Sequence, residues 1–184
     1  MVAYTFTGGS VTPSTEATFV NGSDVTFTGT ATGGPTVADT LFMSGVNQGT
    51  ATHYFTFNLQ ADSGYQLTLN QVSLDYGRTH NNGPTQYSLR VSTDGFSSHT
   101  ELSAGSVTGD TFPLGTLNPS LTLTGITGVV EFRMYYWNAG AANRGGLIDN
   151  VLVDGTVSAI PEPSTYALLG LGLGALWWLR RKRV

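Results

Sequence analysis

Along most of the chain, apolar residues alternate with polar ones at every second position. In His53–Leu59 this alternation places Phe55, Phe57 and Leu59 on one face, and Val130–Trp137 repeats the pattern most cleanly. A period of two is typical of β-strands that bury one face. Shorter segments of similar character are Val2–Thr7, Val25–Gly29, Tyr87–Val91, Leu117–Leu123 (one strand or a pair) and Leu147–Val153.

The segment Tyr65–Tyr76 changes parity part-way along. Its apolar residues lie at odd positions in the first half and at even positions in the second half. Because side chains of a strand alternate between its two faces, a straight strand would expose one of these halves to water. We therefore predict a bulge or a bend at Asn70–Gln71.

The fold class follows from these strands and the turns between them. Before Ile160 no segment shows a sustained apolar period of 3.6, and turn sequences such as Asp94-Gly95 separate the strands. This predicts an all-β, antiparallel architecture. We favour a jelly-roll-like β-sandwich, because its first and last strands can then pair and close the domain. The predicted organisation is a β-sandwich ectodomain over 1–157, a linker with a Pro-Glu-Pro motif over 158–163, a single C-terminal transmembrane helix over 164–179 and a basic cytoplasmic tail over 180–184.

The end of the chain differs from the body in composition. From Tyr166 to Leu179 no residue carries a charge or an amide, and the run closes on two tryptophans. A helix over this run spans about 21 Å, which is short of the roughly 30 Å hydrocarbon core and favours temporary threading over permanent anchoring. The alternative, a buried soluble helix, does not explain an apolar surface on every side. By the positive-inside rule the basic tail stays in the cytoplasm; it consists of Arg180, Arg181, Lys182 and Arg183.

The charge distribution and the absence of cysteine exclude several kinds of site and partner. The 184 residues include no cysteine, which excludes structural disulfides and thiolate metal sites. All 12 acidic residues lie at or before Glu162, whereas half of the 8 basic residues lie in the tail, so the body is strongly acidic. We therefore expect no nucleic-acid partner.

The opening "MVAYTFTGGS" lacks a basic and an apolar signal-peptide region. We expect an N-terminus that is truncated or trimmed, or a start that was mis-assigned.

The sequence holds little catalytic chemistry. It has no cysteine nucleophile, no G-x-S-x-G elbow, no phosphate-binding loop and no H-E-x-x-H, and its three histidines are scattered. We therefore expect that the protein is not an enzyme and needs no cofactor, apart from a candidate structural calcium ion.

A candidate glycan-binding face lies opposite the apolar face of Val130–Trp137. It presents Arg133, Tyr135 and Trp137, which would suit stacking on sugar rings if they are exposed. The alternative is that a loop or a second layer covers them. Arg78 belongs to a second candidate, the polar loop Asp75–Pro84, although Asn-Asn-Gly-Pro within it is also typical of a simple turn.

Two acidic residues flank the last predicted strand. Asp149 and Asp154 offer oxygen ligands of the kind that calcium prefers, although the sequence has no EF-hand loop. Alternatively, Asp149 caps the preceding turn Asn143–Gly146 through a local hydrogen bond.

Three features stand in order at the end of the chain: Pro161-Glu162-Pro163, the apolar segment, and Arg180–Arg183. This arrangement resembles the PEP-CTERM sorting signal of Gram-negative bacterial surface proteins. The resemblance implies recognition and cleavage near the motif by an exosortase, a membrane-embedded transpeptidase-like protease. It also implies an exported protein that is held transiently in the inner membrane and then reaches the cell surface or the extracellular matrix.

The body is similar to β-rich domains that commonly precede this signal, at "YTFTGGS", "YSLRVSTDGF" and "LIDNVLVDGTV". The sequence therefore predicts an exported protein with a structural or adhesive role in exopolysaccharide or biofilm. Its expected partners are an exosortase, the membrane and, as a candidate, exopolysaccharide. A lectin-like carbohydrate-binding module is the main alternative, and a polysaccharide hydrolase is the third.

Overall fold

The structure is a computed structural model that describes residues 1–28, 39–46, 49–109, 112–141 and 144–161. It contains one short 3-10 helix, η1 (Thr7–Gly9), among these residues. The strands are β1 (Val2–Tyr4), β2 (Thr15–Glu16), β3 (Val20–Gly22), β4 (Thr26–Thr28), β5 (Leu41–Met43), β6 (His53–Ala61), β7 (Tyr65–Arg78), β8 (Gln86–Ser92), β9 (Thr100–Ser106), β10 (Gly115–Leu117), β11 (Ser120–Ile126), β12 (Val130–Trp137) and β13 (Gly146–Ala159).

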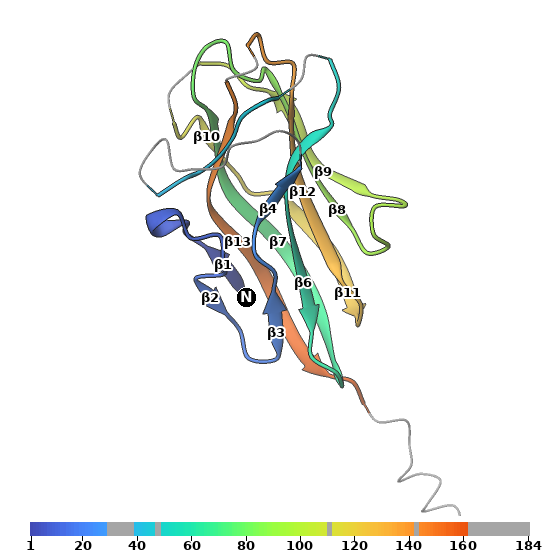
Figure 1. Ribbon diagram of the computed structural model, residues 1–184. Coiled ribbons are helices and arrows are strands. Elements are labelled where there is room, and N and C mark those ends of the chain that lie inside the picture. The colour runs from blue at the N-terminus through green and yellow to red at the C-terminus, as the bar shows by residue number, and fades with distance from the viewer. Residues whose placement is uncertain (29–38, 47–48, 110–111, 142–143, 162–184) are drawn as a thin grey trace, which may run out of the picture.

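The strands form two antiparallel sheets that face each other (Figure 1). Sheet A has the order β10-β7-β13-β1-β2, with β11 also on β7 and β5 also on β13. Sheet B has the order β3-β6-β12-β8-β9, with β4 also on β6. The prediction of an all-β sandwich is thus confirmed. The expected pairing of the first and last strands is also confirmed, because Val2 lies opposite Val153.

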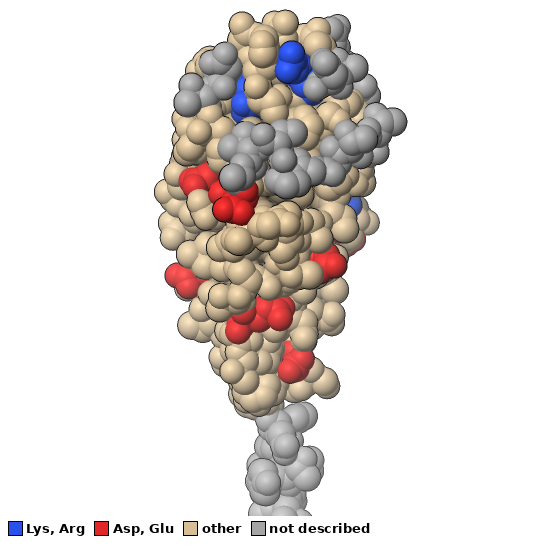
Figure 2. Space-filling model, turned by 60° about the vertical axis from the view of Figure 1, so that its left-hand side comes forward, with Lys and Arg blue, Asp and Glu red and all other residues tan. Residues whose placement is uncertain are grey.

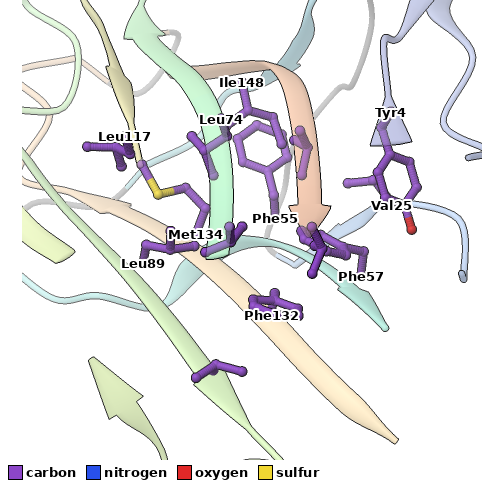
Figure 3. Packing of buried hydrophobic residues seen from close by; sticks show 14 of the residues in the cluster. Tyr4, Val25, Phe55, Phe57, Leu74, Leu89, Leu117, Phe132, Met134 and Ile148 are labelled. Carbon is purple, nitrogen blue, oxygen red and sulfur yellow. The ribbon is translucent and has the colours of Figure 1, made fainter. Parts of the chain in front are cut away.

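The core lies between the two sheets and uses the predicted alternation. Phe57 of β6 and Phe132 of β12 stack with ring centroids 5.1 Å apart, and Phe132 is fully buried. Leu74 and Ile148 enter the same layer from sheet A (Figure 3). Each such side chain stabilises the fold by about 1.5–3 kcal/mol relative to an exposed position. Because the inner faces are apolar, the polar residues of the same strands are left on the outer faces.

The parity change in β7 coincides with a bulge, as predicted. Gln71 pairs with Asp154 and Leu69 with Gly155, so the intervening Asn70 has no partner in β13. The extra residue turns both halves of β7 toward the core. A second bulge, which the sequence did not indicate, lies in β13 between Asp149 and Leu152.

Three element boundaries differ from the prediction. β1 ends at Tyr4 because Phe6 adopts a left-handed conformation (φ 49°) that leads into η1. β7 continues to Arg78, so the first part of the predicted loop Asp75–Pro84 is strand. β13 continues to Ala159 and takes in residues that the sequence assigned to the linker.

Of the residues that the structure describes, none belongs to a helix long and apolar enough to cross a membrane. The transmembrane helix predicted over 164–179 and the basic tail predicted over 180–184 lie outside the described residues.

Candidate functional site

The outer face of sheet B carries the predicted glycan-binding residues of β12. Arg133, Tyr135 and Trp137 alternate with core residues, as expected, and therefore point away from the core. The register places Tyr54 of β6 beside Tyr135, and Arg90 of β8 beside Arg133. Two arginines and several aromatic rings thus share one surface.

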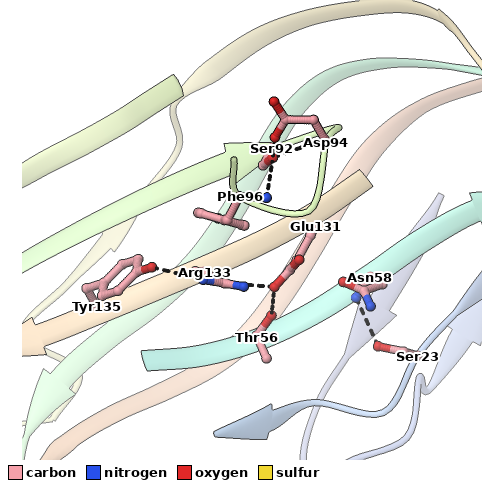
Figure 4. A network of polar contacts seen from close by, with 9 residues as sticks. All are labelled: Ser23, Thr56, Asn58, Ser92, Asp94, Phe96, Glu131, Arg133 and Tyr135. Carbon is pink, nitrogen blue, oxygen red and sulfur yellow. Dashed lines mark hydrogen bonds and ion pairs between the residues drawn. The ribbon is translucent and has the colours of Figure 1, made fainter. Parts of the chain in front are cut away.

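Arg133 is the centre of this surface (Figure 4). Its Nε donates a hydrogen bond to Glu131 Oε1 at 2.6 Å, and its guanidinium lies 4.4 Å from the ring centre of Tyr54 and 3.8 Å from that of Phe96. Partial burial alone would lower the pKa of Arg133, but the hydrogen bonds with Tyr135 and Glu131 outweigh burial and raise it. The charge of Arg133 is therefore already paired with Glu131, and its guanidinium lies between the rings of Tyr54 and Phe96.

Tyr135 is not an open stacking surface. It is only 6% exposed, because the Arg90 guanidinium lies 4.5 Å from its ring centre and the Tyr54 ring lies 4.8 Å away. Arg90 in turn donates to Ser88 Oγ at 2.9 Å. Of the aromatic side chains on the predicted platform, Trp137 is the half-buried one, at the end of β12.

A tight turn brings Phe96 over Arg133. Ser92 Oγ accepts a hydrogen bond from Phe96 N, and Asp94 accepts hydrogen bonds from Ser92 Oγ and from Ser98 N and Oγ. These hydrogen bonds, led by that from the Ser98 side chain, lower the pKa of Asp94 to about 2. The turn at Asp94-Gly95 was predicted, but its position over the neighbouring strand was not.

Arg78 lies apart from the other predicted glycan-binding residues. It ends β7 in sheet A and is only 6% exposed. Its guanidinium donates to the carbonyl oxygens of Gly109 and Pro84. It therefore ties two loops together from within the fold, and the structure does not bring it to the outer face of sheet B.

The two candidate calcium ligands of β13 also have separate surroundings. Asp149 lies opposite Asp75, whereas Asp154 lies opposite Gln71. Burial raises the pKa of Asp149, a hydrogen bond from Asn150 N lowers it, and the nearby charges of Asp75 and Asp39 raise it. Within the described part of the chain, no three His, Asp or Glu side chains are placed to hold a metal ion. Asp149 accepts from the adjacent Asn150 N, and Asn143, the first residue of the turn that it was expected to cap, lies outside the described residues.

A shallow pocket of about 280 Å³, which the sequence did not indicate, lies beside β3 and β6. Its polar lining residues include Ser23, Asn58 and Gln60, and Val129 adds an apolar wall. Asn58 Oδ1 is buried and has no hydrogen-bond partner among the residues that the structure describes. The pocket thus combines a polar lining with a small apolar surface.

The other candidate region is the end of the sandwich where β13 finishes. Ala159 pairs with Tyr65, and Ile160 N donates a hydrogen bond to Gly64 O at 2.8 Å. Pro161 follows directly and is exposed. The first proline of the predicted sorting motif is therefore adjacent to a residue that is hydrogen-bonded to the body, while the rest of the motif lies outside the described residues.

Comparison with protein-family models identifies this end of the chain. The model of the PEP-CTERM protein-sorting motif matches residues 159–183. The chain carries a PEP-CTERM protein-sorting motif. The predicted sorting signal is thereby confirmed, and such a motif indicates an exported protein that is handled at the membrane by an exosortase. No curated protein sequence matches the chain.

Solved structures that resemble the chain include a CBM32 of AlyQ in complex with 4,5-unsaturated mannuronic acid, with 16% identity over 62% of this chain and 77% of that chain and a TM-score of 0.37. Another is the CBM22-1–GH10 part of xylanase 10B from Clostridium thermocellum with xylohexaose, with 11% identity over 79% of this chain but only 27% of the xylanase and a TM-score of 0.39. A CBM4 structure has 10% identity, 84% and 85% coverage and a TM-score of 0.40. Similarity at this level does not assign a ligand to the chain.

The hydrogen bonds of Asp94 predict how the stability of the fold depends on pH. Because folding lowers the pKa of Asp94 from 3.8 to about 2, its ionised form stabilises the fold fully above about pH 4, and this contribution is lost as the pH falls through about 2. We expect Asp94→Asn to lower stability to urea at pH 7 and to differ little from the parent protein at pH 2. The matched control is Asp154→Asn, because the Asp154 carboxylate accepts from the backbone N–H of Gly155. We expect this variant to lose less stability at pH 7 than Asp94→Asn. An equal loss for Asp94→Asn at both pH values would contradict this account.

Proposed function

We propose that this protein is an exported surface or matrix protein, which an exosortase sorts and cleaves at its C-terminal signal. Its β-sandwich then serves as a structural or adhesive part of an exopolysaccharide matrix or biofilm. The observation that carries the proposal is the PEP-CTERM match at residues 159–183, which begins at the last residue of β13. The sorting signal thus follows the folded body without an intervening domain.

The outer face of sheet B supports a structural role for the body. Its charged groups are already paired with one another, as Arg133 is with Glu131 and Arg90 with Glu101. A surface of this kind holds its strands together and adds little unpaired charge.

We also propose that the body is not an enzyme. In support, two of its carboxylates are engaged: Glu131 accepts from Thr56 Oγ1 and Glu101 from Ser88 Oγ.

The acidity of the body also bears on its partners. Acidic side chains are spread over the face shown in Figure 2, while most basic side chains in that view lie toward its upper end. An acidic surface resists nonspecific association with polyanions at low salt. This supports a module that stays soluble after its release and binds its matrix through specific contacts.

Processing can be tested by changing the motif and by removing the enzyme. We expect protein made in exosortase-containing cells to lose its C-terminal segment, and mass spectrometry of its C-terminal peptide to place the new end near the motif. A Pro161→Ala/Pro163→Ala variant and an exosortase-deletion strain should both accumulate the uncut chain in the membrane fraction. Leu152→Ala, on the outer face of sheet A, is the control and should be processed normally. Identical processing in all strains would refute the proposal.

A second candidate function is glycan binding on the outer face of sheet B. It is favoured by the pocket beside Val129, which Asn58 and Gln60 line, and by the half-buried Trp137 at the other end of β12 on the same sheet. A sugar hydroxyl can form a hydrogen bond with the polar side chains of such a surface while the apolar face of the ring packs on a side chain. In this interpretation Arg133 and Tyr135 support the surface rather than stack on the ligand, and Arg78 is not involved.

Glycan binding can be tested on an array of bacterial and plant polysaccharides. If the face binds a glycan, Trp137→Ala should weaken the affinity about 30-fold or more, because a central aromatic contact typically contributes about 2 kcal/mol. Asn58→Ala should weaken it as well, whereas Leu152→Ala on the opposite sheet should not. A folded protein that binds no glycan on the array would rule out this second function.

A further inference from the structure

The end of the body next to the sorting motif carries two exposed apolar side chains, Phe19 and Ile160, beside the half-buried Tyr65. The tail-end patch consists of Phe19, Tyr65 and Ile160. Phe19 and Tyr65 stack nearly parallel, with ring centroids 4.0 Å apart, and Phe19 is nevertheless 43% exposed. Ile160 is 38% exposed and is joined to the residue before Tyr65 by its hydrogen bond to Gly64 O.

Phe19 shares an uncommon backbone conformation with Phe6 and Phe96, but it is the most exposed of the three. Its φ is 68°, in the left-handed region that side chains other than glycine, asparagine and aspartate rarely adopt. The surrounding turn holds it there, since Phe19 O accepts a hydrogen bond from Asp62 N at 3.0 Å. An aromatic ring that is kept at the surface in an unfavourable conformation points to a contact outside the chain.

The position of the patch indicates what that contact is. From Ile160 to Pro163 the chain spans at most about 11 Å, however these residues are arranged. A protein that grips the Pro-Glu-Pro motif must therefore lie directly against this end of the body, from which the chain leaves the sandwich in Figure 1. An enzyme bound at the motif is therefore within reach of the side chains at this end of the body.

We propose that the tail-end patch is a docking surface for the exosortase, which contacts Phe19, Tyr65 and Ile160 while it handles the motif. This inference rests on the proposed function and adds a second recognition element to it. The chemistry favours a protein over a lipid surface, because Asp62, whose backbone N–H donates to Phe19 O, carries an exposed carboxylate that accepts from Asn21 Nδ2 at 2.6 Å. Anionic lipid headgroups repel a carboxylate, whereas a protein can present a matching donor.

The test measures the processing rate of the full chain in exosortase-containing cells. Phe19→Asn removes the ring and places at this position a residue that tolerates the left-handed conformation, so the fold should be retained. We expect Phe19→Asn combined with Ile160→Ser to slow processing about tenfold or more. Leu152→Ser is matched in exposure, 42% against 43%, but lies in the middle of β13, away from the motif, and should be processed at the parent rate. Equal rates for all variants would overturn the proposal.

Photocrosslinking identifies the partner. A benzoylphenylalanine introduced at position 19 should form an adduct with the exosortase, and the same group at position 152 should not. An adduct with lipid alone, or none with the enzyme while processing continues, would overturn the docking surface and leave the proposed function standing. If the Pro161→Ala/Pro163→Ala variant and the exosortase deletion also leave processing unchanged, the proposed function itself fails.

Discussion

The structure depends most on the antiparallel pairing between β7 and β13. This ladder runs from Arg78 opposite Gly146 to Tyr65 opposite Ala159, through the middle of sheet A. The same two strands supply much of the apolar layer that packs on sheet B. Two bulges keep both strands facing the core along their whole length. Because β13 also pairs with β1, the last strand of the body closes the fold.

The same ladder sets where the body ends and the sorting signal begins. Its final pair is followed at once by the hydrogen bond of Ile160 and by the first proline of the motif. Stability of the body and presentation of the motif are thus properties of one strand. An enzyme that acts on the motif therefore meets a folded surface on one side and the apolar C-terminal segment on the other.

The sequence predicted those features that follow from local pattern. Alternation identified the inner faces of β6 and β12, the parity change located the bulge at Asn70, and turn chemistry located the turn at Asp94. It did not predict which outer faces are covered, because strand periodicity distinguishes two faces but says nothing of what lies over the polar one. For this reason the cover that Phe96 forms over Arg133, the burial of Arg78 and the stack of Phe19 on the first residue of β7 required the structure.

The central claim is that the body remains folded up to the first residues of the sorting motif. Hydrogen exchange of the full chain, read residue by residue, tests it most directly. The account predicts that the amide of Ile160 exchanges more slowly than an unstructured amide, because it donates to Gly64 O at the end of the β7–β13 ladder. Exchange at the unprotected rate from Ser158 onward would show that a free linker separates the body from the signal and would contradict the account.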